Sequence, residues 1–139
     1  MRILAIDFGL KRVGLAISDP AGTMAFPLAT ITRTTRQALF QEITAVLARE
    51  GVELIVVGRP SPAPGRVSQT AVQAENFAQS LLRRSGLPVV LVDETLSSEA
   101  AMDDLIAAGV KPGKRKQILD QQAAARILET YLQAPEQFS

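Results

Sequence analysis

The chain has 139 residues, 47% of them hydrophobic, and it contains no Cys and no His. A chain of this length corresponds to one ordinary domain and can bury a core without disulfide bridges. The lack of Cys and His excludes thiolate and imidazole metal sites and catalysis by a histidine base. Any metal ion would therefore be held by oxygen ligands, which favours Mg²⁺ or Mn²⁺.

The 15 basic and 14 acidic residues give a net charge of only +1, so total charge alone indicates no polyanionic partner. No apolar run approaches the roughly 20 residues of a membrane span. We expect one cytoplasmic domain over residues 1–139 that makes no contact with a membrane. Many basic residues lie at predicted turns or element starts, where they are either solvated or hold phosphates: among these are Lys11, Arg12, Arg59, Arg66, Lys114, Arg115 and Lys116.

Two apolar runs open the chain, Ile3–Ile6 and Val13–Ile17, and the turn between them contains Lys11 and Arg12. Short apolar runs bounded by Gly predict buried strands. Asp7 ends the first run. Because an unpaired buried carboxylate costs several kcal/mol on a rough estimate, Asp7 is expected to be paired, to cap the turn or to bind a cation.

The next two elements are a strand and a helix. Met24–Ile31 predicts a third strand, and Pro27 within it, which cannot donate to a ladder, places this strand at a sheet edge. Thr34–Gln37 fits a capping box that starts a helix, and Gly51 ends it.

The central part of the chain alternates strands and helices. Glu53–Gly58 predicts a strand covered on both faces, and Arg59–Gly65, with three prolines, predicts a loop. Ser68 begins a helix with the apolar stripe Ala71, Ala74, Ala78, Leu81 and Leu82, which ends at Gly86. Pro88–Val92 is the last predicted strand, and Asp93 and Glu94 follow it.

Two helices are expected in the last third. The first begins at Ser97 or Ser98, where Asp93 is expected to help cap it, and stops at Gly109. A basic loop, Lys111–Lys116, precedes the last helix, about Gln117–Leu132, whose apolar stripe is Ala124, Ile127, Leu128 and Tyr131. The region around Pro135 is expected to be a frayed tail.

This order of elements predicts an α/β fold. Short turns make the first three strands antiparallel, and helical crossovers make the later strands parallel to the first. We expect one mixed five-stranded sheet with helices on both faces. Ligands of such sheets bind beyond the carboxyl ends of parallel strands, where Asp7, Gly58 and Glu94 lie.

Three carboxylates are the candidate site residues. Asp120 lies on the apolar stripe of the last helix, whereas Asp7 and Glu94 lie at strand ends. Each of them singly has a structural explanation: Asp7 would cap a turn, and Glu94 and Asp120 would each stabilise the start of a helix through its dipole. Together they would repel one another unless cations lie between them. Two divalent ions, with Asp7 bridging both and Glu94 and Asp120 completing one site each, would hold the attacking water and the leaving oxygen of a phosphodiester.

Four segments form a further pattern. They are Ile6-Asp7-Phe8-Gly9 with Arg12-Val13-Gly14-Leu15-Ala16; Val57-Gly58-x-Pro60 with Gly65; Asp93-Glu94-x-Leu96-Ser97-Ser98-x-Ala100; and Lys114-Arg115-Lys116 with Asp120-x-x-Ala123-Ala124-x-x-Ile127-Leu128. In order and spacing this pattern closely resembles the YqgF/RuvX family. These are Holliday-junction resolvases of bacteria, also described as nucleases that mature pre-16S ribosomal RNA.

The resemblance implies a ribonuclease H-like fold and a Mg²⁺- or Mn²⁺-dependent nuclease with Asp7, Glu94 and Asp120 as its acidic triad. Three departures from the family pattern affect substrate contacts and leave the acids intact: Thr95 in place of Arg, Arg59 in place of Leu, and Pro62-Ala63-Pro64-Gly65 in place of Asn-x-Asp-Gly.

Two other functions remain open. A non-catalytic nucleic-acid-binding protein on the same scaffold would bind in a salt-dependent way that acid-to-amide changes leave unaltered. Asp7-x-Gly9 with Gly14 also resembles the phosphate hairpin of actin-like ATPases and sugar kinases, but one domain is too short for their two-lobed cleft.

A resolvase that cuts symmetrically needs two active sites, hence a homodimer. With five Phe, one Tyr and no Trp, the composition argues against sequence-specific readout of a single strand.

Overall fold

The computed structural model describes residues 1–60, 69–94 and 106–138, with the backbone alone described for Pro60, Gln69, Thr70 and Glu94. The helix expected from Ser97 or Ser98, up to residue 105, therefore lies outside the described residues, as do Arg66, Thr95 and the Pro62–Gly65 segment. Within the described part of the chain, no helix is long and apolar enough to cross a membrane.

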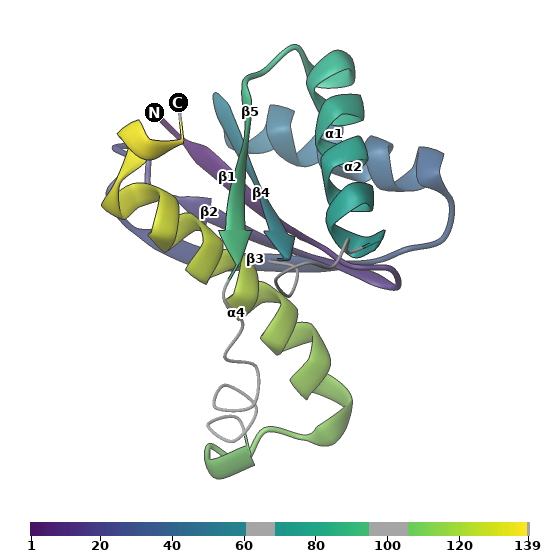
Figure 1. The fold of residues 1–139 in the computed structure, drawn as a ribbon. Helices are drawn as coiled ribbons and strands as arrows, with labels where there is room; N and C mark the ends of the chain where they lie inside the picture. The colour runs from purple at the N-terminus through teal and green to yellow at the C-terminus, as the bar shows by residue number, and fades with distance from the viewer. Residues whose placement is uncertain (61–68, 95–105, 139) are drawn as a thin grey trace.

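Five strands form one mixed sheet in the order β3-β2-β1-β4-β5 (Figure 1). The strand β1 pairs antiparallel with β2, and β2 with β3, whereas β1 pairs parallel with β4, and β4 with β5. The bounds are Ile3–Phe8 for β1, Arg12–Ser18 for β2, Ala25–Thr32 for β3, Leu54–Pro60 for β4 and Val89–Glu94 for β5. The predicted α/β architecture, its strand directions and the edge position of β3 are confirmed.

Helices cover both faces of the sheet (Figure 1). The helices α1 (Arg36–Glu50) and α2 (Gln69–Ser85) pack on one face, and α4 (Pro112–Gln133) packs on the other. A short 3₁₀ helix, Pro135–Gln137, follows α4 where a frayed tail was expected. We refer to the two sides of the sheet as the α1/α2 face and the α4 face.

The period of two along each strand divides the buried side chains into two cores. Leu4, Ile6 and Phe8 of β1 point to the α1/α2 face, whereas Ile3 and Ala5 point to the α4 face. The α4 core is completed by small and medium residues, Ala16, Val56, Val92, Ala124, Ala125, Ile127 and Leu128 among them. This core brings α4 close to the sheet.

Four details differ from the sequence-based expectations. The cap of α1 is Thr35, whose hydroxyl accepts from the Ala38 N–H at 3.0 Å, so the helix starts one residue later than the predicted capping box. The helix α4 begins at Pro112 instead of near Gln117, because Pro is favoured in the first turn, where its missing N–H costs nothing. Arg59 and Pro60 belong to β4, and Leu82 is exposed, while Phe77 fills the α2 stripe.

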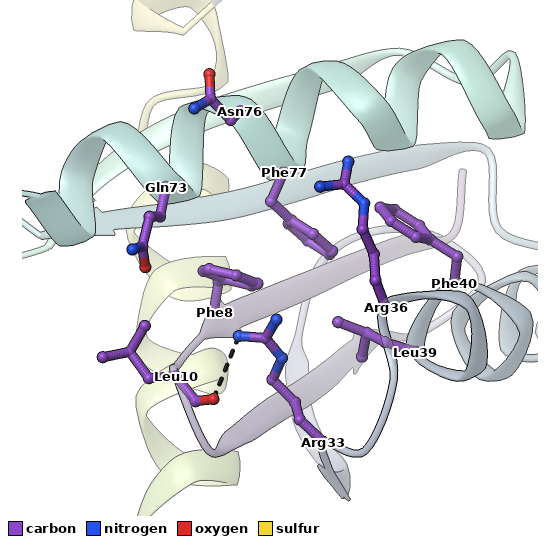
Figure 2. Close-up of a pocket in the computed structure, with 9 residues that line it drawn as sticks. All are labelled: Phe8, Leu10, Arg33, Arg36, Leu39, Phe40, Gln73, Asn76 and Phe77. Carbon is purple, nitrogen blue, oxygen red and sulfur yellow. Dashed lines mark hydrogen bonds between the residues drawn. The ribbon is translucent and has the colours of Figure 1, made fainter.

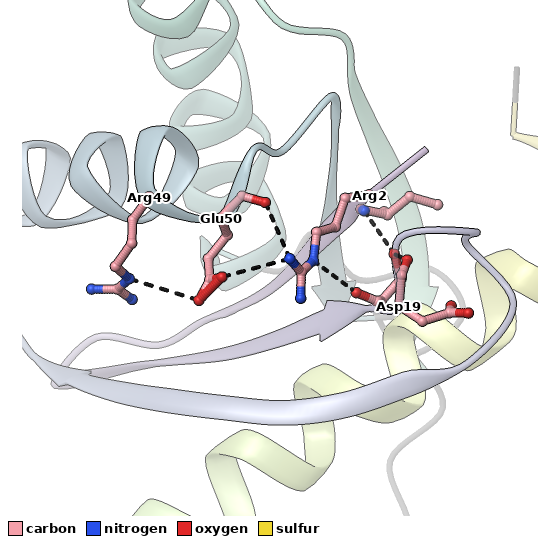
Figure 3. A network of polar contacts seen from close by, with 6 residues as sticks. Arg2, Asp19, Arg49 and Glu50 are labelled. Atoms are coloured by element: carbon pink, nitrogen blue, oxygen red, sulfur yellow. Dashed lines mark hydrogen bonds and ion pairs between the residues drawn. The ribbon is translucent and has the colours of Figure 1, made fainter.

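A polar network stabilises the end of the sheet where β1 begins (Figure 3). Arg2 donates to the Ser18 carbonyl from Nε, and its Nη1 lies 3.8 Å from the Glu50 carboxylate at the end of α1. Asp19 accepts bonds from the backbone N–H groups of Thr23 and Met24 and from the Thr23 hydroxyl. These contacts lie at the opposite end of β1 from Asp7, so they hold the scaffold without touching the candidate site.

Candidate active site at the carboxyl edge of the sheet

Asp7 lies on the α4 face near the carboxyl end of β1. It follows Ile3 and Ala5 in the alternation that packs these residues against α4, and it is half-buried. Its partners in the sheet are Gly14 on β2 and Gly58 on β4. Because neither glycine has a side chain, the surface on both sides of the Asp7 carboxylate is left to α4 and to ligands.

Because residue 14 is glycine, α4 approaches this surface more closely than a side chain at position 14 would allow. A Cβ atom at position 14 would lie 2.1 Å from the carbonyl oxygen of Asp120 and 3.0 Å from its Cβ. Cross-strand partners have Cβ positions about 5 Å apart, so the Cβ atoms of Asp7 and Asp120 lie within about 8 Å of each other. The structure therefore brings Asp7 and Asp120 together, and carboxylates at this separation can reach one shared ion.

Asp120 already has a cationic partner. The Nε of Arg12 donates to its Oδ2 at 2.7 Å, and the two side chains are 30% and 19% exposed. Arg12 precedes Gly14 by two residues on β2, so it lies on the α4 face as well. Arg12, expected to hold a phosphate, thus forms an ion pair with Asp120 in this structure.

Glu94 is the last residue of β5, two residues beyond Val92, which packs in the α4 core. Its backbone position belongs to the same alternation as Val92, and its register partner is Pro60, two residues past the Gly58 partner of Asp7. Among described side chains, which do not include that of Glu94, no three carboxylates form a group able to hold a metal ion. Of the expected triad, the structure therefore describes the side chains of Asp7 and Asp120, which lie near each other.

The predicted phosphate-binding cations fall into two groups. Lys11, Lys114 and Lys116 are exposed, and the last two lie in the first turns of α4, which extend beyond the sheet (Figure 1). No acidic residue occupies the first turn of α4, so this end of the helix attracts anions. Arg115 instead donates from Nε to the Val110 carbonyl at 2.8 Å and holds the start of the helix.

Arg59 lies on the opposite side of the sheet from Asp7. It follows Ile55 and Val57 in the alternation toward the α1/α2 face. There it donates to Asp93 at 2.9 Å and to Glu75 at 2.5 Å. These two hydrogen bonds, that to Asp93 first, raise the pKa of Arg59 above its ordinary value. Arg59 is therefore a bridge between β4, β5 and α2, and Asp93 has this partner in addition to any helix-capping role.

A cavity of about 290 Å³ opens behind the hairpin that β1 and β2 form, on the α1/α2 face of the sheet (Figure 2). Phe8, which directly follows Asp7, stacks on Phe77 with ring centroids 4.6 Å apart, and Phe40 stacks on Phe77 at 5.5 Å. The guanidinium carbons of Arg33 and Arg36 lie 4.8 Å and 5.3 Å from the centroids of Phe8 and Phe40. No local sequence signal marks this cavity, because the gathering of three of the five Phe depends on packing between distant elements.

Comparison with protein families gives one match over nearly the whole chain. Residues 1–134 match the family model described as "RuvX: Holliday junction resolvase". A curated protein of Maridesulfovibrio salexigens named "Putative pre-16S rRNA nuclease" is 53% identical over 132 residues, which cover 95% of this chain and 98% of that protein. The expected family is confirmed.

Two solved structures with a similar fold are Holliday-junction resolvases. The Thermus thermophilus RuvC structure superposes with a TM-score of 0.58 at 15% identity, covering 100% of this chain and 99% of that one. The Fowlpox virus resolvase in complex with substrate Holliday junction DNA gives a TM-score of 0.57 at 14% identity, covering 95% and 99%. At these identities the likeness concerns the fold, and it supports the ribonuclease H-like architecture.

Proposed function

We propose that this chain, which belongs to the RuvX family and is therefore a nuclease acting on nucleic acid, hydrolyses phosphodiesters with divalent metal ions held by Asp7, Glu94 and Asp120. The observation that carries the proposal is the approach of α4 at Gly14, which brings Asp120 within about 8 Å of Asp7. We also propose that residues 1–139 form one nuclease domain, as the match of the family model over residues 1–134 supports.

The donor set suits Mg²⁺ or Mn²⁺. With no His and no Cys in the chain, every side-chain ligand with a charge is a carboxylate, the preference of hard cations. Arg12 neutralises Asp120 in the structure, so a metal ion held by Asp120 would replace this ion pair. Two such ions, when bound, would activate water and stabilise the leaving oxygen. The protein's own part is to hold Asp7 on a rigid central strand and Asp120 on a packed helix.

The substrate is held by the cations around this edge. Lys11 projects from the hairpin turn, and Lys114 and Lys116 from the start of α4, all of them exposed. Such residues fix the phosphate backbone without reading sequence. Arg66, and Arg12 once it has left Asp120, complete the proposed phosphate contacts. Arg59 and Arg115 were expected there too, but their side chains already make structural contacts: Arg59 forms two ion pairs, and Arg115 donates to a backbone carbonyl.

Two substrates follow from the names of the relatives: branched DNA of the Holliday-junction type and the ends of pre-16S ribosomal RNA. The family description supports the first and the curated relatives the second. Both are cytoplasmic in bacteria, so we place the protein there. For a four-way junction, paired cuts require two active sites, so we propose a homodimer for that substrate.

The test compares both substrates with Mg²⁺, Mn²⁺ or EDTA, using wild-type protein and the variants Asp7→Asn and Asp120→Asn. We expect each variant to bind nucleic acid at least as tightly as wild type, because a negative charge is removed, and to cleave at least about 100-fold more slowly, since even a change beside a metal ligand costs about 10- to 100-fold. The control is Asp19→Asn, a carboxylate at the far end of the sheet.

Full cleavage by Asp7→Asn would overturn the metal mechanism. Salt-dependent binding without any cleavage would instead favour the non-catalytic binding protein. Light scattering on the same samples, with and without a four-way junction, tests the homodimer: a mass of one chain on a junction that is cut twice would refute it.

A further inference from the structure

The cavity behind the hairpin contains the features of a nucleotide site. Its volume of about 290 Å³ lies at the lower end of small-ligand pockets, which begin near 300 Å³. Among the described residues, nine line the cavity; none of these is acidic, and two are arginines. The site therefore attracts a small anion with an apolar part, and repels cations.

Each of the two guanidinium groups lies near an aromatic ring, and Phe40 has a second such neighbour in Arg84, whose guanidinium carbon is 4.2 Å from the ring centroid. Arg33 lies over Phe8 and also donates from Nη1 to the Gly9 carbonyl at 3.0 Å, while Arg36 lies over Phe40 and donates from Nη2 to the Ser80 hydroxyl at 2.7 Å. The rings are themselves nearly buried, whereas Arg33 is half-buried and Arg36 is exposed, so the guanidinium groups contribute to the outward surface of the cavity. Unpaired bases stack on such planes as they do on aromatic rings, and neighbouring phosphates bind their edges.

The cavity and the candidate active site share one hairpin. Asp7 and Phe8 are consecutive, and the alternation of β1 sends Asp7 to the α4 face and Phe8 into the cavity. The β1–β2 hairpin separates the two places, and at its tip Leu10 is 62% exposed and also lines the cavity. Figure 2 shows Leu10 and Gln73 at one end of the cavity, with Arg33 and Arg36 beside the three rings. A strand that passes over the tip can thus reach both places.

We propose that this cavity receives an unpaired nucleotide of the strand being cut, close in sequence to the scissile phosphate, with its base against the guanidinium planes of Arg33 and Arg36. This inference rests on the proposed function, since it takes the substrate strand as the ligand. It adds a requirement for single-stranded or distorted substrate, because a paired base cannot enter. The contacts are with planes and charges, so we expect little preference for one base.

The experiment measures binding separately from cleavage. A fluorescein-labelled RNA hairpin with a short single-stranded tail of mixed sequence, in which the stem fixes the register of the tail, is titrated with the full chain in EDTA, and its anisotropy is followed. In a series of such RNAs, one abasic nucleotide is moved along the strand. Wild-type protein is expected to bind about tenfold more weakly when the abasic position coincides with the cavity, the loss typical of one stacked base. The variant Gln73→Trp, which fills the cavity from the surface of α2, should weaken binding about tenfold and abolish the abasic effect.

The matched control is Gln79→Trp, an exposed position on the same helix away from the cavity. It should bind like wild type and retain the abasic effect, and urea unfolding of both variants verifies that they fold. If Gln73→Trp is unfolded, the abasic series on wild type alone decides. A uniform abasic series refutes the nucleotide site even when cleavage is normal. A position-specific effect in a protein that does not cleave supports the site and counts against the proposed mechanism alone.

Discussion

The substitution Gly14→Ala tests the close approach of α4 to the sheet. The added Cβ would lie 2.1 Å from the carbonyl oxygen and 2.5 Å from the carbonyl carbon of Asp120, both of them backbone atoms that no side-chain rotation can move. Carbon atoms normally pack about 3.5–4.0 Å apart. The helix must therefore retreat from β2 by roughly 1 Å, and the packing of Ala124, Ile127 and Leu128 against the sheet loosens.

We expect Gly14→Ala to lose about 3 kcal/mol of unfolding free energy, the upper end of the usual cost of overpacking. Urea unfolding followed by circular dichroism measures this loss. The retreat also carries Asp120 away from Asp7, and a 1 Å misplacement costs about 100-fold in rate, so cleavage should fall by about that factor in the fraction that is folded.

The control is Gly113→Ala at the start of the same helix. Apart from the neighbouring backbone of the helix, no described atom lies within 4 Å of the Cβ it would add, so it should leave stability unchanged or raise it by up to about 1 kcal/mol. If Gly14→Ala unfolds at the same urea concentration as wild type and cleaves at the same rate, the close contact between β2 and α4 is wrong.

Three further predictions concern the scaffold. Thr35→Ala removes the cap of α1 and should cost about 1 kcal/mol in urea unfolding, whereas Thr35→Ser should cost less; equal losses would contradict the cap. Arg59→Leu removes the cation between Glu75 and Asp93 and should lower the free energy of unfolding by about 1 kcal/mol at low salt and by less at high salt; a salt-independent loss would argue against the ion pairs. The hydrogen bonds from Thr23 and Met24 lower the pKa of Asp19 to about 2 from 3.8, so its charged form stabilises the fold above pH 4 and this contribution is lost as the pH falls toward 2; the stability difference between wild type and Asp19→Asn should shrink over that range, and a constant difference would refute it.

The fold could be predicted because its determinants are local. The apolar runs that become β1, β2, β4 and β5 are short and bounded by turn residues, and Pro27 marks an edge strand by its missing N–H. The start of α4 at Pro112 is not predicted, because Pro112 and Gly113 are also typical of a loop. Pro in the first turn of a helix is equally typical, and the distinction depends on how the residues after it pack.

The candidate site could be predicted only in part. The convergence of Asp7 with Asp120 follows from strand direction and helix periodicity. The partners of Arg12 and Arg59 do not, because an ion pair between residues 108 positions apart depends on the tertiary structure. One signal was available in the sequence: the alternation along β4 places Gly58 and Arg59 on opposite faces, which separates Arg59 from the carboxylates.

The outer strand β3 determines how two copies of the chain could meet. Its register with β2 shifts from Leu15–Ala29 to Ala16–Pro27, which leaves Leu28 as an extra residue beside a proline. A bulge and a missing N–H at adjacent positions interrupt the row of groups that an incoming strand would need. A continuous intermolecular sheet through β3 is therefore disfavoured, and if the protein forms a symmetric pair, we expect its twofold axis to pass through another surface.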